Sequence, residues 1–304
     1  MVDQAVQIAI TPGDPAGIGP ELVDRLLAQP ALLGGAQVRL VSGGTAAGPT
    51  AGAVPPGRPS EEGGAAALAD LREALRLAAA GEVDAVVFAP LNKSSLHLAG
   101  MREPDELQWM EGVLGVRGAS EVNVLPELTT SRVTSHVALS EVAAGVTREV
   151  VVERGLLLDA VLRGAGHAAP RLAVCALNPH AGESGRFGRE EIEVIGPAVE
   201  ELRARGVDAA GPFPCDTVFV RARAGAFDGV LTMYHDQGQI AMKLLGFDRG
   251  VTMAGGLPFP VCTPAHGTAF DLVGTGRADL GALAAAVDLA RRLAERHVSE
   301  LGRA

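Results

Sequence analysis

The sequence is short of aromatic residues and of positive charge. Aromatic residues make up 3% of the 304 residues, whereas 47% are hydrophobic and 39 are glycine. This mix is typical of an α/β protein in which Ala, Val and Leu fill the core and tight turns join strands to helices. The 26 basic residues are outnumbered by 36 acidic ones. The net charge of −10 argues against nucleic acid as a partner, because an acidic surface repels phosphate backbones.

The sequence also lacks paired cysteines and long apolar runs. Cys175, Cys215 and Cys262 are odd in number and form no CxxC pair, so we expect reduced structural thiols. Residues 1–15 contain no basic segment followed by a long apolar one, and no apolar run approaches the length of a membrane span. We therefore expect a soluble, cytoplasmic protein with no membrane partner.

Short apolar segments alternate with longer segments of helical periodicity. The apolar segments are nearly continuous, as in strands buried on both faces of a parallel sheet, and they predict strands at residues 6–11, 36–43, 83–90, 171–177 and 228–234. The periodic segments predict helices at residues 65–80, 148–164, 189–205 and 280–300. In the third helix, the buried face is predicted to contain Ile192, Ile195, Val199 and Leu202.

The alternation predicts two α/β/α domains with mostly parallel sheets. Residues 43–64, rich in Gly, Pro and Ala, predict a loop, and residues 126–135 predict a second break. We place the first domain at residues 1–128 plus 273–304 and the second at 129–272. The C-terminal helix is expected to pack back on the first half.

Two glycine-rich segments follow predicted strands. ITPGDPAGIGPELV (10–23) matches neither a GxGxxG dinucleotide fingerprint nor a phosphate loop ending in Gly-Lys-Ser/Thr. The spacing of its glycines is compatible both with a plain strand–helix turn and with a ligand-binding loop. PAHGTAFDLVGTGRADLGAL (264–283) is likewise either a connection or a loop that wraps an adenine through backbone contacts.

Three histidines stand at or just beyond the ends of apolar segments. They are His136 in VTSHVALSE, His180 in LNPHAGESGRFGREEIE and His235 in MYHDQGQ. Ligands of open α/β sheets gather at the carboxyl ends of the strands, and imidazole is a common ligand of divalent metals. Taken singly, each is typical of a hydrogen-bonded structural histidine. Taken together, they also fit an open metal site, and spacing alone does not decide between the two.

The motifs taken together resemble one enzyme family. They are TPGDPAGIGPE (11–21), APLNK (89–93), LNPHAGESGRFGREE (177–191), CDT (215–217), MYHDQG with Lys243, and HGTAFDLVGTGRA (266–278). In this order they resemble 4-hydroxythreonine-4-phosphate dehydrogenase, an NAD- and metal-dependent enzyme of pyridoxal phosphate synthesis. The last motif is also similar to the adenine-side loop of isocitrate and isopropylmalate dehydrogenases, which share the family's fold.

The resemblance implies an active site in the cleft between the domains. His136, His180 and His235 would bind one divalent metal ion per subunit, with zinc first and magnesium, manganese or cobalt as alternatives. The family shares this site across a two-fold homodimer, so the second domain would carry both the histidines and the dimer interface. Asp216 and Lys243 would lie nearby: the lysine suits an anionic substrate group, and the aspartate could orient a ligand or relay a proton.

The same resemblance implies a nicotinamide cofactor, NAD or NADP, bound by the two glycine-rich loops. The residues that would bind it are Gly13, Asp14, His266, Gly267, Thr268 and Asp271.

The substrate positions depart from the family's pattern. The family usually has a Gly-His-Thr-Glu run where this chain reads PDELQWMEGVLG (104–115), which leaves Glu106 and Leu107 at the His and Thr positions. Thr252 and Val261 stand where Asn and Arg are usual. A phosphate needs several charge-assisted donors, and of these Lys243 remains. We therefore expect the substrate-binding residues Lys243, Glu106, Leu107, Thr252 and Val261 to bind phosphate poorly.

The resulting hypothesis is an NAD(P)- and metal-dependent dehydrogenase that oxidises, and then decarboxylates, a hydroxy acid in the manner of 4-hydroxythreonine-4-phosphate dehydrogenase. The metal would act as a Lewis acid while a base removes the hydroxyl proton and hydride passes to the nicotinamide. The alternative is a dihydrodiol carboxylate dehydrogenase of aromatic acid breakdown, or another dehydrogenase of a non-phosphorylated hydroxy acid. A metal hydrolase and a retired ligand-binding homologue are rivals. The retained histidines disfavour a retired protein, and the HGTA loop favours a nucleotide cofactor over hydrolysis.

Overall fold

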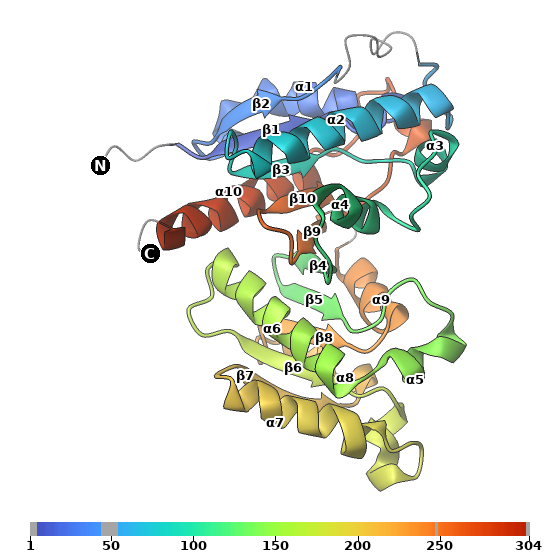
Figure 1. The fold of residues 1–304 in the computed structure, drawn as a ribbon, viewed down its shortest axis with the longest axis vertical. Coiled ribbons are helices and arrows are strands. Elements are labelled where there is room, and N and C mark those ends of the chain that lie inside the picture. Colours follow the sequence, from blue (N-terminus) through green and yellow to red (C-terminus); the bar gives the residue numbers. More distant parts are fainter. Residues whose placement is uncertain (1–4, 44–53, 247–248, 302–304) are drawn as a thin grey trace. The chain divides into compact units, whose positions relative to one another are not determined.

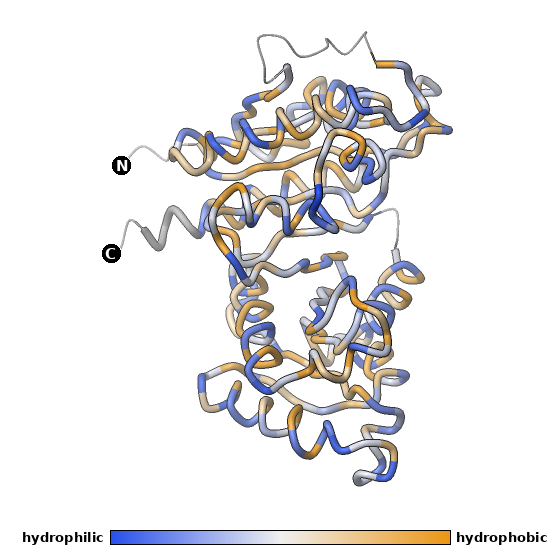
Figure 2. Tube along the Cα trace, turned by 45° about the vertical axis from the view of Figure 1, so that its right-hand side comes forward, coloured by the Kyte–Doolittle hydropathy of each residue, from blue (hydrophilic) through white to orange (hydrophobic). Residues whose placement is uncertain are grey.

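The computed structural model describes residues 5–43, 54–246 and 249–301 (Figure 1). The chain splits into two compact units, of which the first comprises Met1–Ala119 and Asp248–Ala304 and the second Ser120–Phe247. Hydrophobic and hydrophilic residues alternate along the helices of both units, as expected when one helix face covers a sheet (Figure 2). In the described part of the chain, no helix has the length and hydropathy needed to cross a membrane.

The first unit has the strand order β2-β1-β3-β10-β9. Neighbouring strands are parallel except for β9, which runs antiparallel to β10. The strands are β1 (Gln7–Thr11), β2 (Gln37–Leu40), β3 (Ala85–Phe88), β9 (Val251–Gly255) and β10 (Val261–Pro264). The helices are α1 (Gly19–Leu27), α2 (Glu61–Ala79), α3 (Lys93–Leu98), α4 (Glu106–Leu114) and α10 (Gly281–Leu301), with 3-10 turns η1 (Pro30–Leu33) and η5 (Phe270–Leu272).

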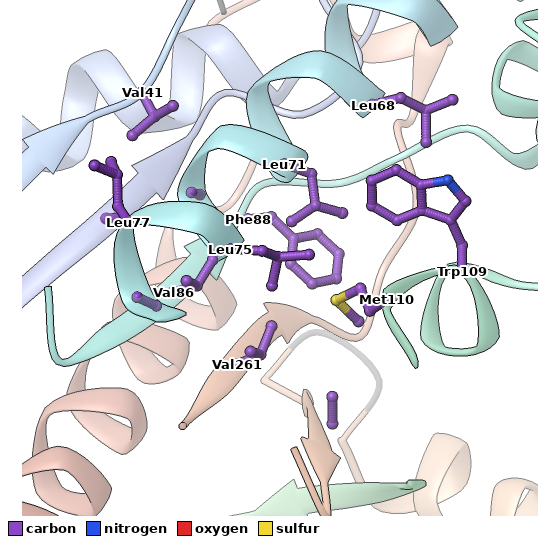
Figure 3. Packing of buried hydrophobic residues seen from close by; sticks show 14 of the residues in the cluster. Val41, Leu68, Leu71, Leu75, Leu77, Val86, Phe88, Trp109, Met110 and Val261 are labelled. Atoms are coloured by element: carbon purple, nitrogen blue, oxygen red, sulfur yellow. The ribbon is translucent and has the colours of Figure 1, made fainter. Parts of the chain in front are cut away.

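The core of the first unit follows from side-chain alternation along its strands. On one face, Val86 and Phe88 of β3 pack with Leu71 of α2 in a cluster that includes Trp109 of α4 (Figure 3). The guanidinium of Arg72 lies 5.1 Å from the centroid of the Trp109 ring, which adds a cation–π contact at the edge of this cluster. Helix α10 packs on β3 and β10.

The second unit has the strand order β4-β5-β8-β6-β7, parallel except for the β4–β5 hairpin. Its strands are β4 (Ser120–Leu125), β5 (Leu128–Arg132), β6 (Arg171–Cys175), β7 (Asp208–Phe213) and β8 (Gly229–Thr232). Its helices are α5 (Val142–Gly145), α6 (Arg148–Ala165), α7 (Gly196–Ala204), α8 (Cys215–Arg223) and α9 (His235–Gly246), and its shorter turns are η2 (Leu139–Glu141), η3 (Pro179–Gly185) and η4 (Glu191–Ile195). Residues of α8 and α9 pack in one cluster with β6 and β8, where β8 contributes Val230. The neighbouring Gly229 faces Leu158 and Leu162 of α6, so helices cover both faces of the sheet and give the three-layered α/β architecture expected from the sequence.

All five predicted strands and four predicted helical regions are present, but three local predictions were wrong. Residues 126–135 are not a break, because β5 lies there after a two-residue hairpin connection. The predicted loop at 43–64 ends sooner, because the hydroxyl of Ser60 accepts a hydrogen bond from the Gly63 N–H at 3.0 Å and starts α2; residues 44–53 lie outside the described residues.

The third error concerns the buried face of the helix predicted at 189–205. Ile195, Val199 and Leu202 are buried, but Ile192 is 48% exposed. The segment begins with a π turn, η4, in which the wider winding shifts the helical phase by about one residue. As a result Glu191, and not Ile192, faces inward and is 4% exposed.

The two compact units also differ from the predicted domain boundaries. Residues 248–272 belong to the first unit, whereas we assigned them to the second. The pairing of β10 with β3 explains this grouping, because it adds β10 and its hairpin partner β9 to the sheet of the first unit.

Replacing Gly64 of α2 by alanine should lower the free energy of unfolding. A Cβ at this position would lie 1.9 Å from the carbonyl oxygen of Ser95, so we expect overpacking to cost about 1–3 kcal/mol. Gly112 of α4 is the matched control: nothing lies within 4 Å of its Cβ position, and alanine there should add about 0.5–1 kcal/mol of stability. Denaturant titrations followed by the fluorescence of Trp109 measure both, and a stabilised Gly64→Ala variant would contradict the packing.

The three thiols should differ in reactivity towards iodoacetamide. Burial raises the pKa of Cys262 to about 12, and a hydrogen bond with Cys215 raises the pKa of the buried Cys175. The same hydrogen bond lowers the pKa of the half-buried Cys215. Because the thiolate is the nucleophile, Cys215 should be alkylated first at pH 8 in the folded protein. Peptide mass spectrometry identifies the site, with Cys215→Ser as control, and Cys262 reacting first would contradict this order.

Candidate active site

The three histidines follow three neighbouring parallel strands of the second unit. His136 comes after β5, His235 begins α9 directly after β8, and His180 lies in η3 after β6. Since β5, β8 and β6 are adjacent and parallel, their carboxyl ends meet at one edge of the sheet. The rings of His136 and His235 are together, with centroids 5.8 Å apart.

Hydrogen bonds beyond the strands place the segments that carry these histidines. The N–H and the hydroxyl of Thr134 both donate to the carbonyl of Met233, at 3.0 and 2.9 Å, which continues the β5–β8 pairing towards His136 and His235. The side chain of Gln237 accepts from the N–H of Met233 at 2.8 Å and donates to the carbonyl of Ala176 at 2.9 Å. Gln237 thus ties the end of β8 to the end of β6.

A buried ion pair supports the first histidine. Arg132 at the end of β5 is 4% exposed and is paired with Glu121 of β4. The Nε of Arg132 also donates to the hydroxyl of Ser135 at 3.0 Å, next to His136. A carboxylate oxygen of Glu121 and a ring nitrogen of His136 lie within 4.8 Å of one another.

Two of the three histidines are spaced like ligands of one divalent transition metal, although in the described part of the chain the nitrogens of all three do not lie within 4.8 Å of one another. Metal–imidazole bonds of about 2.1 Å hold the ring centroids of two histidines on one ion about 5–6 Å apart, which matches His136 and His235. The Nδ1 of His235 lies 2.7 Å from an Asp236 carboxylate oxygen, an arrangement that fixes the ring and leaves Nε2 for a metal. His180 is exposed at the same sheet edge.

The predicted catalytic residues lie on the helices that follow β7 and β8. Asp216 is the second residue of α8 and Lys243 lies in the last turn of α9, and both are exposed. Asp216 adjoins Cys215 in the sequence. The hydrogen bond with Cys175 lowers the pKa of Cys215, and the negative charge of Asp216 partly opposes this shift.

The two glycine-rich loops of the first unit lie side by side. The Ile18 N–H donates to the Thr268 carbonyl at 3.1 Å, and a Cβ at Gly17 would lie 2.8 Å from that of Thr268. Gly13 has φ of +71° and approaches Pro90 so closely that a Cβ would lie 2.4 Å from its carbonyl oxygen. The structure therefore joins the two groups of predicted cofactor-binding residues at the carboxyl edge of β1, β3 and β10.

Buried polar atoms in these loops fit a ligand with hydrogen-bonding groups. Asp14 is fully buried, and its Oδ1 accepts from the Ala16 N–H at 2.9 Å. Asp14 Oδ2 and His266 Nε2 are buried and have no hydrogen-bond partner among the described residues. Gly267 and Asp271 are exposed. Unsatisfied buried groups of this kind are rare, and a dinucleotide would supply hydroxyl and amide partners.

The predicted substrate positions of the first unit are mostly apolar or acidic. Leu107 and Val261 belong to the hydrophobic cluster under α2, and Val261 is fully buried (Figure 3). Glu106 begins α4, and Thr252 lies half-buried in β9. None of these four side chains supplies a cation.

Sequence reasoning missed three residues of the second unit's sheet edge, namely Arg132, Glu191 and Gln237. Glu191 and Gln237 stand within the motifs described above, but nothing in the sequence of those motifs indicated a structural role for either residue. Arg132 lay within the segment that we predicted as a break.

The comparisons with known proteins agree with this architecture. The family model of the pyridoxal phosphate biosynthetic protein PdxA matches residues 33–290. A protein of Pseudomonas aeruginosa named "Putative 4-hydroxythreonine-4-phosphate dehydrogenase 2" is 47% identical over 94% of this chain and 96% of its own length. The D-threonate 4-phosphate dehydrogenase of Pectobacterium atrosepticum is 37% identical over 94% and 99%.

Solved structures show the same similarity. The 4-hydroxythreonine-4-phosphate dehydrogenase of Klebsiella pneumoniae superposes with a TM-score of 0.81 at 33% identity, covering 97% of this chain and 100% of that one. A terephthalate 1,2-cis-dihydrodiol dehydrogenase of Burkholderia xenovorans gives 0.71 at 27%, covering 95% and 98%. An isocitrate dehydrogenase of Methylococcus capsulatus, at 0.53 and 17% with 98% and 90% covered, shares the fold. With a family model and relatives that match over most of the chain, this protein belongs to the PdxA family, whose named relatives here are dehydrogenases.

Proposed function

We propose that the chain is a nicotinamide- and metal-dependent dehydrogenase that oxidises the hydroxyl group of a hydroxy acid. The observation that carries the metal part is the placement of His136, His180 and His235 after three adjacent parallel strands, with two of the rings 5.8 Å apart. These three residues would hold one divalent ion, zinc before magnesium, manganese or cobalt. Bound there, such an ion supplies Lewis-acid polarisation of a substrate oxygen.

The residues of the chain would orient the substrate and move its proton. The carboxylate of Asp236 fixes the His235 ring, and Asp216 is the proposed group that orients a ligand or relays the hydroxyl proton. The cation of Lys243 would bind an anionic group of the substrate. The nicotinamide, NAD or NADP, would accept hydride, and a β-keto acid product would then lose CO₂.

The cofactor is proposed to bind the loops of the first unit. Close approach at Gly17 lets Gly17 and Ile18 lie against Thr268, and close backbone approach at Gly13 packs the same loop on Pro90. The buried Asp14 Oδ2 and His266 Nε2, which have no hydrogen-bond partner in residues 5–43, 54–246 and 249–301, support a role in binding hydrogen-bonding groups. Gly267, Thr268 and Asp271 complete the proposed set.

A second copy of the chain is the proposed partner, with the metal site shared between the two copies. Apolar side chains near the histidine edge support an interface: Leu139 is 72% exposed and Leu244 is 83% exposed. Val137, which follows His136 directly, and Ile240 of α9 are exposed as well. Ile240 and Leu244 are four residues apart on α9 and so share one face of the helix, and an exposed apolar face of this kind supports an association surface.

The substrate is proposed to carry carboxylate and not phosphate. The four proposed substrate positions of the first unit carry no cationic side chain; they are Glu106, Leu107, Thr252 and Val261. A phosphate dianion needs several charge-assisted donors. Named relatives point both ways, since two act on 4-phosphates and the Burkholderia enzyme acts on a terephthalate dihydrodiol. That last similarity makes a dihydrodiol carboxylate dehydrogenase the second candidate.

Alanine in place of His136, His180 or His235 should abolish turnover and weaken metal binding. Each change removes one ligand, and calorimetric titration of Zn²⁺ into chelator-treated protein measures the loss directly. His167→Ala is the matched control, because this exposed histidine lies in the same unit and away from the sheet edge, beside Asp228. A variant of any of the three that retains wild-type affinity and turnover would remove that residue from the metal site.

The chain should turn over 4-hydroxythreonine 4-phosphate more slowly than a non-phosphorylated hydroxy acid. A charge-assisted hydrogen bond contributes roughly 1.5–3 kcal/mol, so the loss of two or three corresponds to about 10²-fold or more in kcat/KM. The measurement is the ratio of kcat/KM for the phosphorylated compound to that for its dephosphorylated analogue, followed by the absorbance of the reduced cofactor. A ratio well above one would show that the phosphate is bound by groups other than these.

A further inference from the structure

His180 lies in a backbone turn that amino acids other than glycine rarely adopt. The residues from His180 to Ser184 all have positive φ, with values of 53°, 53°, 76°, 44° and 57°. Four of these five carry a Cβ, which clashes with the following carbonyl in the left-handed conformation. Such a run persists only where the surrounding structure imposes it.

The buried carboxylate of Glu191 supplies that constraint. Its Oε1 accepts hydrogen bonds from the backbone N–H groups of Leu177 and Asn178, at 2.9 and 2.7 Å. Its Oε2 accepts from the side-chain amide of Asn178 at 3.0 Å. These contacts fix the chain where it leaves β6, two residues before His180. The π turn η4 makes them possible, because it turns Glu191 inward.

Two glycines let the turn close around this carboxylate. A Cβ at Gly182 would lie 2.6 Å from Glu191 Oε2, and one at Gly188 would lie 2.4 Å from the amide nitrogen of Asn178. Both have positive φ, 76° and 126°. The turn that carries His180 is therefore packed directly on Glu191, whose hydrogen bonds are to the two residues that precede Pro179.

We propose that Glu191 is a positioning residue that holds His180 in place to bind the metal. Glu191 itself is not a candidate ligand, because it is 4% exposed and both of its oxygens accept hydrogen bonds from Leu177 and Asn178. The carboxylate acts through the backbone: it orders residues 177–178, and the strained turn then presents the imidazole. This inference rests on the proposed role of His180 as a metal ligand.

The test combines metal affinity with the order of the loop in the metal-free protein. Zn²⁺ is titrated by calorimetry into chelator-treated full-length protein, and amide hydrogen exchange of residues 177–188 is measured without metal. Glu191→Ala should weaken Zn²⁺ binding about 10–100-fold, as is typical when a group that orients a ligand is removed, and should speed up this exchange. Glu191→Gln should lose less, because its amide oxygen still accepts from both backbone N–H groups.

Glu193→Ala is the matched control, since this glutamate lies in the same π turn but is exposed and paired with Arg189. It should leave both measurements unchanged. Should Glu191→Ala fail to fold, Glu191→Gln decides, because its NH2 group cannot accept the hydrogen bond from the Asn178 amide: wild-type affinity together with wild-type exchange overturns the proposal. His180→Ala separates the two levels of the argument. If it weakens Zn²⁺ binding and the Glu191 variants do not, the positioning role is wrong; if it has no effect, the metal role of His180 is wrong.

Discussion

The parallel hydrogen bonding of β5, β8 and β6 is the constraint on which the candidate metal site depends. These strands lie far apart in the sequence, yet their register places Arg132 opposite Thr232 and Val174 opposite Leu231. The histidines follow within a few residues of these pairs. Because a slip of one residue would turn every side chain to the other face of the sheet, the buried faces of the strands fix the height at which each histidine leaves the edge.

The first unit applies the same constraint to its loops. β1, β3 and β10 are parallel, so the segments after them leave from one edge of the sheet. The Asp14 N–H donates to the Pro90 carbonyl at 3.0 Å, and Thr268 packs on Gly17. Here the glycines are required by contact with neighbouring backbone.

The strands and the histidines at their ends were predictable, because continuous apolar segments and the polar residue that follows are both local signals. β5 was not, since its sequence LTTSR is polar and its strand forms through pairing with β4 and β8. The role of Glu191 was hidden for a related reason. Helical periodicity assigned the inward position to Ile192, and only the π turn moves that position to Glu191. A buried acid that binds the backbone has no signature in hydropathy.

The proposed substrate positions and the histidine edge are constrained by different parts of the chain, so either one can change without the other. The histidine edge depends on backbone hydrogen bonds within the second unit. Leu107 and Val261, by contrast, belong to the core cluster of the first unit. The arginine that the family resemblance expects at Val261 would now enter a fully buried apolar site, where an unpaired charge is strongly unfavourable. Leu107 and Val261 therefore pack within one hydrophobic core cluster. Placing a phosphate-binding cation at either position would require several residues of that cluster to be replaced together.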